Sequence, residues 1–203
     1  MNHSFAGSWF PAKVFEIDVM RYTQEDLIRR ARLILGYDHP RTDYVVEESD
    51  GFDVNKVLGE RIFEWYGGYL RNSALCILRQ EDVASECVVS KAAGQSGGVF
   101  VAVPENVVRV CGVCFEHWHC VAEIIGSEHF EAVLRRQLNP YCRATADTPV
   151  AVCCVDGTIM CWPDGGDNDS VLTKLNVVSD HSPDYYDLSG DGLEMLMGYL
   201  SRC

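Results

Sequence analysis

Residues 150–162 constrain the fold of this chain more than any other segment. Two β-rich runs, Val-Ala-Val-Cys-Cys-Val and Thr-Ile-Met-Cys-Trp, flank the dipeptide Asp156-Gly157. Asp-Gly suits a two-residue type I′ turn, because both central positions of that turn require positive φ angles. The segment therefore predicts a β-hairpin.

Helical and strand-like stretches alternate along the rest of the chain. Thr23 and Gly36 are the expected ends of a first helix, with Leu27, Ala31 and Ile34 on its apolar face. Further helices are expected from Asp53 until the glycines at 67–68 fray the end, around 121–125, over 127–138, and from a cap at 189 or 191 through 200. Strands are expected at 74–78, 99–103, 107–115 and 175–178, with a polar connection over 80–98.

This order of elements predicts an α+β fold with a mainly antiparallel sheet covered by helices. The 203 residues are expected to form a single domain over 1–203, with a helical N-terminal subregion at 1–72.

The charge of the chain argues against some classes of partner. The formal net charge is -13, whereas nucleic acids and anionic membranes attract clustered Lys and Arg. A basic partner protein is compatible with this charge, and plain solubility explains it equally well. If a partner binds the acidic surface, the residues expected to contact it are Glu47, Glu48, Asp50, Asp164, Asp167 and Asp169.

The chain is expected to reside inside cells. Its first residues lack the basic stretch and apolar run of a secretory signal, and no segment reaches the ~18 consecutive apolar residues of a membrane span. Ten cysteines without such a signal indicate free thiols in a reducing compartment.

The segment 111–120 holds the densest group of chemically capable side chains. Its potential metal ligands are Cys111, Cys114, His117, His119 and Cys120. Zinc is the one cofactor that this spacing suggests, since a Cys-x2-Cys pair followed by His and Cys can supply four ligands. The flanking residues are strand-like, however, and positions i and i+3 of a flat strand face opposite sides. Cysteine acting as a small buried hydrophobe is the alternative.

The same segment allows a second chemical hypothesis. A cysteine nucleophile needs a neighbouring base and a third group that orients the base. His117, His119 and Cys120 are the candidates for such an enzyme, although no local signature of a cysteine protease accompanies them.

The carboxyl-terminal third resembles a known superfamily. A strand ending in Val155-Asp156-Gly157, a second strand ending at Trp162, an acidic loop and a closing helix at 191–200 resemble the end of SUKH proteins, and most of all the herpesvirus US-twenty-two family. The apolar stretch at 110–115, with its embedded glycine, is similar to a strand of that family. The resemblance implies an α+β binding scaffold without catalytic residues.

Three functions remain open at this point. The leading hypothesis is a non-enzymatic protein that binds other proteins, as a viral factor that counters host defence or cell-death proteins would. The second is the zinc-dependent or cysteine-dependent enzyme centred on 111–120. The third is an antitoxin-like immunity protein.

Overall fold

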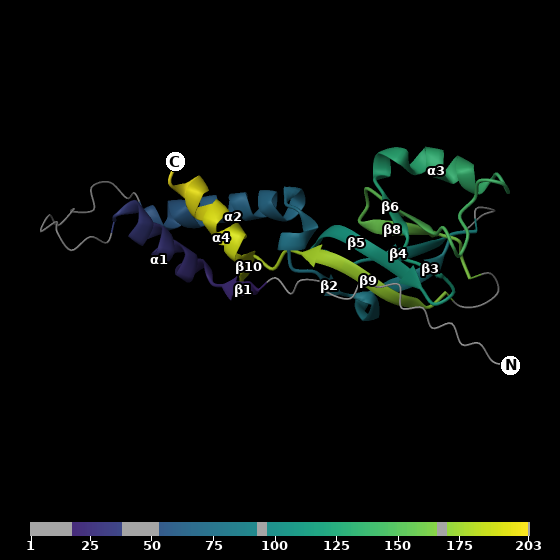
Figure 1. Ribbon diagram of the computed structural model, residues 1–203, viewed down its shortest axis with the longest axis horizontal. Helices are drawn as coiled ribbons and strands as arrows, with labels where there is room; N and C mark the ends of the chain where they lie inside the picture. The colour runs from purple at the N-terminus through teal and green to yellow at the C-terminus, as the bar shows by residue number, and fades with distance from the viewer. Residues whose placement is uncertain (1–17, 38–52, 93–96, 166–169, 203) are drawn as a thin grey trace, which may run out of the picture.

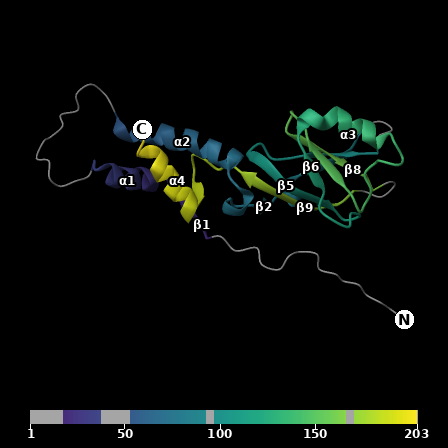
Figure 2. The ribbon, with the colours of Figure 1, turned by 45° about the horizontal axis from the view of Figure 1, so that its top comes forward.

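The chain folds into an elongated molecule with most helices gathered at one end and most strands at the other (Figure 1; Figure 2). The computed structural model describes residues 18–37, 53–92, 97–165 and 170–202. One end, which we call the helical region, is built from the helices α1 (Gln24–Leu35), α2 (Val54–Asn72) and α4 (Gly190–Leu200) and the short strand pair β1 (Val19–Tyr22) and β10 (Tyr186–Ser189). The remaining strands and the helix α3 (Phe130–Gln137) form the sheet region.

Helix α1 (Gln24–Leu35) begins and ends at the residues that the sequence predicts. Thr23 Oγ1 accepts a hydrogen bond from the Asp26 backbone N–H at 3.2 Å, and the Asp26 carboxylate accepts one from the Thr23 N–H at 3.4 Å. This reciprocal capping box satisfies two donors at the start of the helix. Gly36 ends it with a φ of 79°, a left-handed conformation that favours glycine.

Helix α2 (Val54–Asn72) is longer than the sequence predicts. Asp53 caps it as expected, but the glycines at 67–68 do not fray its end. The next turn carries Tyr69 and Leu70, and both side chains are buried in the core. Their packing outweighs the low helix propensity of glycine.

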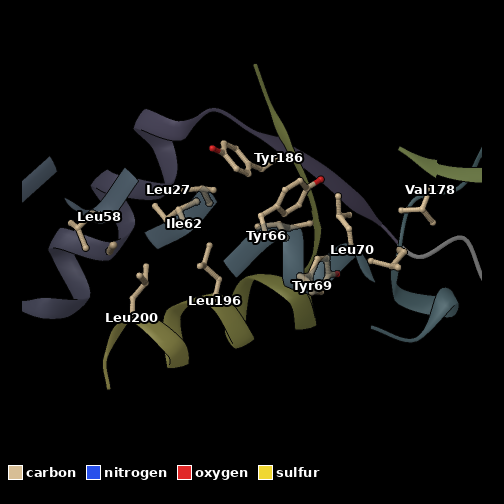
Figure 3. Close-up of a cluster of buried hydrophobic side chains, with 13 residues drawn as sticks. Leu27, Leu58, Ile62, Tyr66, Tyr69, Leu70, Val178, Tyr186, Leu196 and Leu200 are labelled. Atoms are coloured by element: carbon tan, nitrogen blue, oxygen red, sulfur yellow. The ribbon is translucent and has the colours of Figure 1, made fainter. Parts of the chain in front are cut away.

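Side chains from three helices form the core of the helical region, as Figure 3 shows. Helix α4 (Gly190–Leu200) begins at Ser189, whose Oγ accepts a hydrogen bond from the Gly192 N–H at 3.1 Å. A Cβ at Gly192 would lie 2.5 Å from the Tyr69 hydroxyl, so only glycine allows α4 to approach α2 this closely. β1 (Val19–Tyr22) pairs antiparallel with β10 (Tyr186–Ser189) beside these helices.

The sheet region contains two sheets. The three-stranded sheet has the order β2 (Glu81–Asp82), β9 (Leu172–Ser179) and β5 (Val107–Phe115). The five-stranded sheet has the order β3 (Val88–Lys91), β4 (Val99–Ala102), β8 (Thr158–Trp162), β7 (Val150–Cys153) and β6 (Glu123–Ile125). All pairings are antiparallel except that of β6 with β7.

The two sheets pack against each other, and α3 (Phe130–Gln137) covers the outer face of the five-stranded sheet. The alternation along β8 shows this arrangement. Ile159 and Cys161 lie in the core between the sheets, whereas Met160 and Trp162 lie in the core beneath α3. This content confirms the α+β class with mainly antiparallel sheets.

The hairpin at 150–162 is confirmed, but its turn is not the predicted type. The Cys154 N–H donates to the Thr158 carbonyl at 2.8 Å, and the Gly157 N–H donates to the Cys154 carbonyl at 3.3 Å. These bonds close a three-residue loop in which Gly157, with a φ of 78°, takes the left-handed position. This loop has glycine at its one left-handed position, whereas a type I′ turn has two residues with positive φ.

Three other predictions of local structure are wrong. Residues 123–125 form the strand β6 and no helix, because a run this short has no helical period and finds hydrogen-bond partners in β7. Residues 75–77 form a 3-10 turn in place of a strand. The supposed connection at 80–98 contains the strands β2 and β3.

The two regions are joined through strands of the three-stranded sheet. Val178 of β9 belongs to the core of the helical region, and Val108 and Cys111 of β5 pack against it. Organisation as a single domain stays a prediction. In the described parts of the chain, no helix combines the length and the hydrophobicity that a bilayer span requires.

Candidate functional site

The two cysteines on β5 lie in different cores. Cys111 packs against the core of the helical region, and Cys114 packs against the core between the sheets. The register of β5 shifts between Val110 and Gly112, yet this bulge does not turn the two side chains toward a common centre. Burial raises the pKa of the Cys111 thiol, which disfavours the thiolate that a metal site requires.

Of the three residues beyond the strand, His117 contacts Pro163, whereas His119 and Cys120 contact different atoms of Asp147. His117 Nε2 lies 3.1 Å from the Pro163 carbonyl oxygen, and His119 Nδ1 lies 2.7 Å from Asp147 Oδ1. The Cys120 thiol donates to the Asp147 carbonyl at 3.2 Å. Within the described residues, no group of three or more His, Cys, Asp or Glu side chains is arranged to hold a metal ion. The structure therefore does not bring the five predicted zinc ligands together.

The pair formed by His119 and Asp147 has the geometry of a base and its orienting carboxylate. Both side chains are open to solvent, with exposed fractions of 70% and 78%. The neighbouring Cys120 thiol donates its hydrogen bond to the Asp147 backbone carbonyl and not to the His119 imidazole. A cysteine nucleophile needs the base within hydrogen-bonding reach, so this arrangement gives the enzymatic hypothesis little support.

A polar cleft of about 500 Å³ opens beside His117. Its walls come from the β5–β6 connection, from the end of α3 and the loop that follows, and from the end of β8. Its lining residues include His117, Gln137, Arg143, Trp162 and Asp164. These residues are far apart in the sequence, and only the packing of α3 on the sheet assembles them.

Backbone carbonyls and amides hold the walls of this cleft. His117 Nε2 and Trp118 Nε1 both donate to the Pro163 carbonyl, each at 3.1 Å, and thereby fix the chain after β8. Gln137 is buried, and its Oε1 accepts a hydrogen bond from the Ala144 N–H at 2.8 Å. This bond ties the loop after α3 to the helix.

Three residues that line the same cleft carry polar groups without a partner among the described residues. Trp162 has no exposed surface, and its indole Nε1–H has no hydrogen-bond partner within the described structure. A Cβ at Gly98 would lie 2.7 Å from that nitrogen, so glycine is needed there. Neither the Arg143 guanidinium nor the Asp164 carboxylate makes an ion pair with a described residue.

Asp164 is the one predicted partner-binding residue that the structure describes. Glu47, Glu48, Asp50, Asp167 and Asp169 lie outside the described residues. The acidic surface expected to bind a basic partner therefore stays a prediction.

A hydrophobic groove between α1 and α4 is a second candidate site. It has a volume of about 390 Å³ and is lined by Arg30, Leu33, Ile34, Leu193, Glu194 and Met197. Leu33 and Ile34 are 61% and 59% exposed. Ile34 follows Leu27 and Ala31 at helical spacing as predicted, but those two side chains are buried and Ile34 is exposed. The apolar run at 33–35 is too wide for one helix face, which is the signal that could have revealed this surface.

No protein-family model matches this chain, and no curated protein is significantly similar to it. The resemblance to the SUKH superfamily, and the role it implies, therefore stay predictions. Functions for the two candidate sites must therefore be argued from their geometry and chemistry.

Proposed function

We propose that this protein is a non-enzymatic binding protein, and that the groove between α1 and α4 receives an amphipathic helix of a partner protein. The observation that carries the proposal is the exposure of Leu33 and Ile34 on the wall of a hydrophobic groove. Exposed large apolar residues are common singly, but grouped around a groove they are typical of interaction sites.

The shape and chemistry of the groove favour a helix as its occupant. Two helices form the walls, and amphipathic helices bind such grooves through apolar residues at positions i, i+3, i+4 and i+7. Met197 adds a flexible apolar side chain that adapts to different ligands. Burying one exposed Leu or Ile side chain on binding contributes about 1.5–3 kcal/mol.

Charges at the groove and over the whole chain suggest the polar side of the partner. Arg30 and Glu194 place one charge of each sign beside the apolar residues, so they can fix the direction of a bound helix. The net charge of -13 would increase the association rate of a basic partner. We therefore propose a helix with one apolar face and a predominantly basic opposite face.

The experiment places a photo-crosslinking amino acid at position 33 of the full chain, with position 155 as the matched control. Val155 is also apolar and is 93% exposed, but it lies in the hairpin loop of the sheet region. We expect crosslinks from position 33 to map to a basic amphipathic helix in the partner, and none to map there from position 155.

A quantitative comparison follows with the synthetic peptide of that helix. Ile34→Glu should weaken its binding about tenfold or more, since it removes an apolar contact on the wall of the groove, whereas Val155→Glu should not change it. Crosslinks to the same helix from both positions, or equal affinities of the two variants, would contradict the proposal.

Metal analysis of the purified protein tests the enzymatic alternative. Stoichiometric zinc that disappears in Cys114→Ser would favour the metal-dependent hypothesis over the one proposed here.

A further inference from the structure

We propose that the polar cleft beside His117 is a separate binding site for a small zwitterion of the amino-acid or dipeptide class. The cleft lies in the sheet region and shares no residue with the groove between α1 and α4. Its volume of about 500 Å³ lies within the range of roughly 300–1,000 Å³ that small-molecule sites occupy.

Two opposite charges in the cleft determine the chemical class of the ligand. Arg143 and Asp164 both line it, and they pair neither with each other nor with another described residue. A guanidinium binds a carboxylate through two parallel hydrogen bonds, and a carboxylate binds an ammonium group. A ligand that carries both groups satisfies both residues at once.

Trp162 lines the cleft without adding a polar contact for the ligand. Its Nε1–H is a buried donor without a described partner, but it has no exposed surface and lies beside Gly98. The class of ligand therefore rests on Arg143 and Asp164. Ala144, Ala146 and Pro163 provide apolar walls for an aliphatic side chain.

The site is formed before any ligand binds. His117 and Trp118 hold the Pro163 carbonyl, and Gln137 holds the loop that carries Arg143. A preformed site loses little free energy to reorganisation on binding. A phosphate dianion suits the site less well, because Asp164 would repel it and Arg143 is the one Arg or Lys among the lining residues.

The first experiment uses ligand-observed NMR on the full chain with the twenty L-amino acids, glycyl-L-leucine, L-leucyl-glycine and inorganic phosphate as probes. We expect at least one zwitterionic probe to bind, and its N-acetyl and C-amide forms to bind about 10- to 100-fold more weakly, because each loses one charged hydrogen bond. The amino acids and the dipeptides distinguish the two sizes of ligand. Binding by none of the zwitterions, or preference for phosphate, would overturn the proposal.

Variants then assign the two charges. Arg143→Gln should remove the preference for a free carboxylate over the amide, and Asp164→Asn should remove the preference for a free amine over its acetyl form. Arg136→Gln changes an exposed arginine of α3 that does not line the cleft, so it should bind like the parent protein. Unchanged preferences in the first two variants would also overturn the proposal.

Two features keep this test independent of folding and of the proposed function. The acetyl and amide probes test recognition by Asp164 and Arg143 in the unaltered protein, so this result does not depend on whether a variant folds. Ile34→Glu should leave binding in the cleft unchanged. Failure of the protein-binding proposal would therefore not be confused with failure of this one.

Discussion

The helical region and the sheet region bury their hydrophobic residues in different ways. In the sheet region, the five-stranded sheet has a core on each face, one against the three-stranded sheet and one beneath α3. In the helical region, one core lies between three helices, and α1 and α4 leave Leu33 and Ile34 exposed beside it. Large apolar side chains are exposed at both ends, but Leu33 and Ile34 are neighbours on the wall of a groove, and our proposed protein-binding site is therefore in the helical region.

The cores also differ in chemistry. The core between the sheets is built largely from Val, Ile and Leu side chains on alternating strand positions. The core of the helical region includes Tyr66, Tyr69 and Tyr186, and the Tyr69 hydroxyl donates to the Ile77 carbonyl at 3.1 Å. A buried tyrosine hydroxyl is costly without a polar partner, and the Tyr186 hydroxyl has none among the described residues.

The largest expected effect is the loss of an aromatic side chain from the sheet region. Phe115 is fully buried between the sheets and contacts Trp118 edge to face, with ring centroids 4.8 Å apart. Phe115→Ala should lower the free energy of unfolding by about 3–5 kcal/mol, through lost burial and the cavity left behind. Urea unfolding followed by circular dichroism measures this change.

Val155→Ala is the control for this prediction. Val155 is almost fully exposed in the hairpin loop, so its change should stay within about 0.5 kcal/mol. Equal destabilisation of the two variants would mean that Phe115 does not lie in a packed core.

The corresponding change in the helical region is Leu196→Ala. Leu196 of α4 is fully buried against α2, and its truncation should lower the free energy of unfolding by about 2–5 kcal/mol.

Hydrogen exchange of the Leu196→Ala variant, measured in both regions, tests whether the two regions unfold together. If the chain is a single cooperative domain, protection should fall in the strands β7 and β8 as well as in the helices. A loss confined to the helices would show that the two regions unfold separately.

An ion-pair cluster at the junction of the two regions should have a smaller effect. Asp187 of β10 is buried, and its Oδ1 lies 3.4 Å from Arg21 Nε and 3.5 Å from an Arg79 guanidinium nitrogen. Asp187→Asn keeps the shape but removes the charge. Because both arginines are about half exposed, we expect a loss of about 1–2 kcal/mol, below the cost of breaking a fully buried pair.

Thermal unfolding of three single variants and one double variant measures this contribution. Arg29→Gln removes a more exposed arginine, which lies 4.0 Å from the Asp26 carboxylate, and should change stability little. Arg79→Gln should lose part of what Asp187→Asn loses, and the double variant should lose less than the sum of the two. Additive losses would show that Asp187 and Arg79 do not interact.

Local signals made part of this fold predictable. The helix caps at Thr23 and Asp53 and the hairpin around Gly157 depend only on residues that are close in the sequence. Their positions could therefore be predicted from the sequence. The strand β1 is different, because four residues in the sequence Val-Met-Arg-Tyr have no clear alternation and their partner β10 lies far along the chain. Such pairing depends on tertiary contacts, as does the parallel pairing of β6 with β7.

The candidate sites were less predictable than the fold. The residue types at 111–120 suggested a single site, but the structure does not bring these side chains together. His117 instead lines a cleft with Arg143 and Trp162. That cleft depends on where α3 and its following loop lie on the sheet. The groove between α1 and α4 likewise needs the position of the last helix beside the first.

The smallest expected effect concerns the amino end of α1, whose far end carries Leu33 and Ile34. Thr23→Ala removes the side-chain half of the capping box and should lower the free energy of unfolding by about 1 kcal/mol, whereas Thr23→Ser keeps the hydroxyl and should lose much less.

Hydrogen bonds from the Thr23 side chain and backbone lower the pKa of Asp26 from its usual 3.8. The stabilisation from this carboxylate is therefore present above pH 3.8 and is lost as the pH falls through the lowered folded-state pKa. Thr23→Ala should weaken this acid dependence, which urea unfolding at pH 7 and at pH 2–4 measures against Thr23→Ser. An unchanged acid dependence would show that the box does not hold the start of α1 in solution, and the position of the groove-lining face would then rest on Leu27, Ala31 and their core contacts alone.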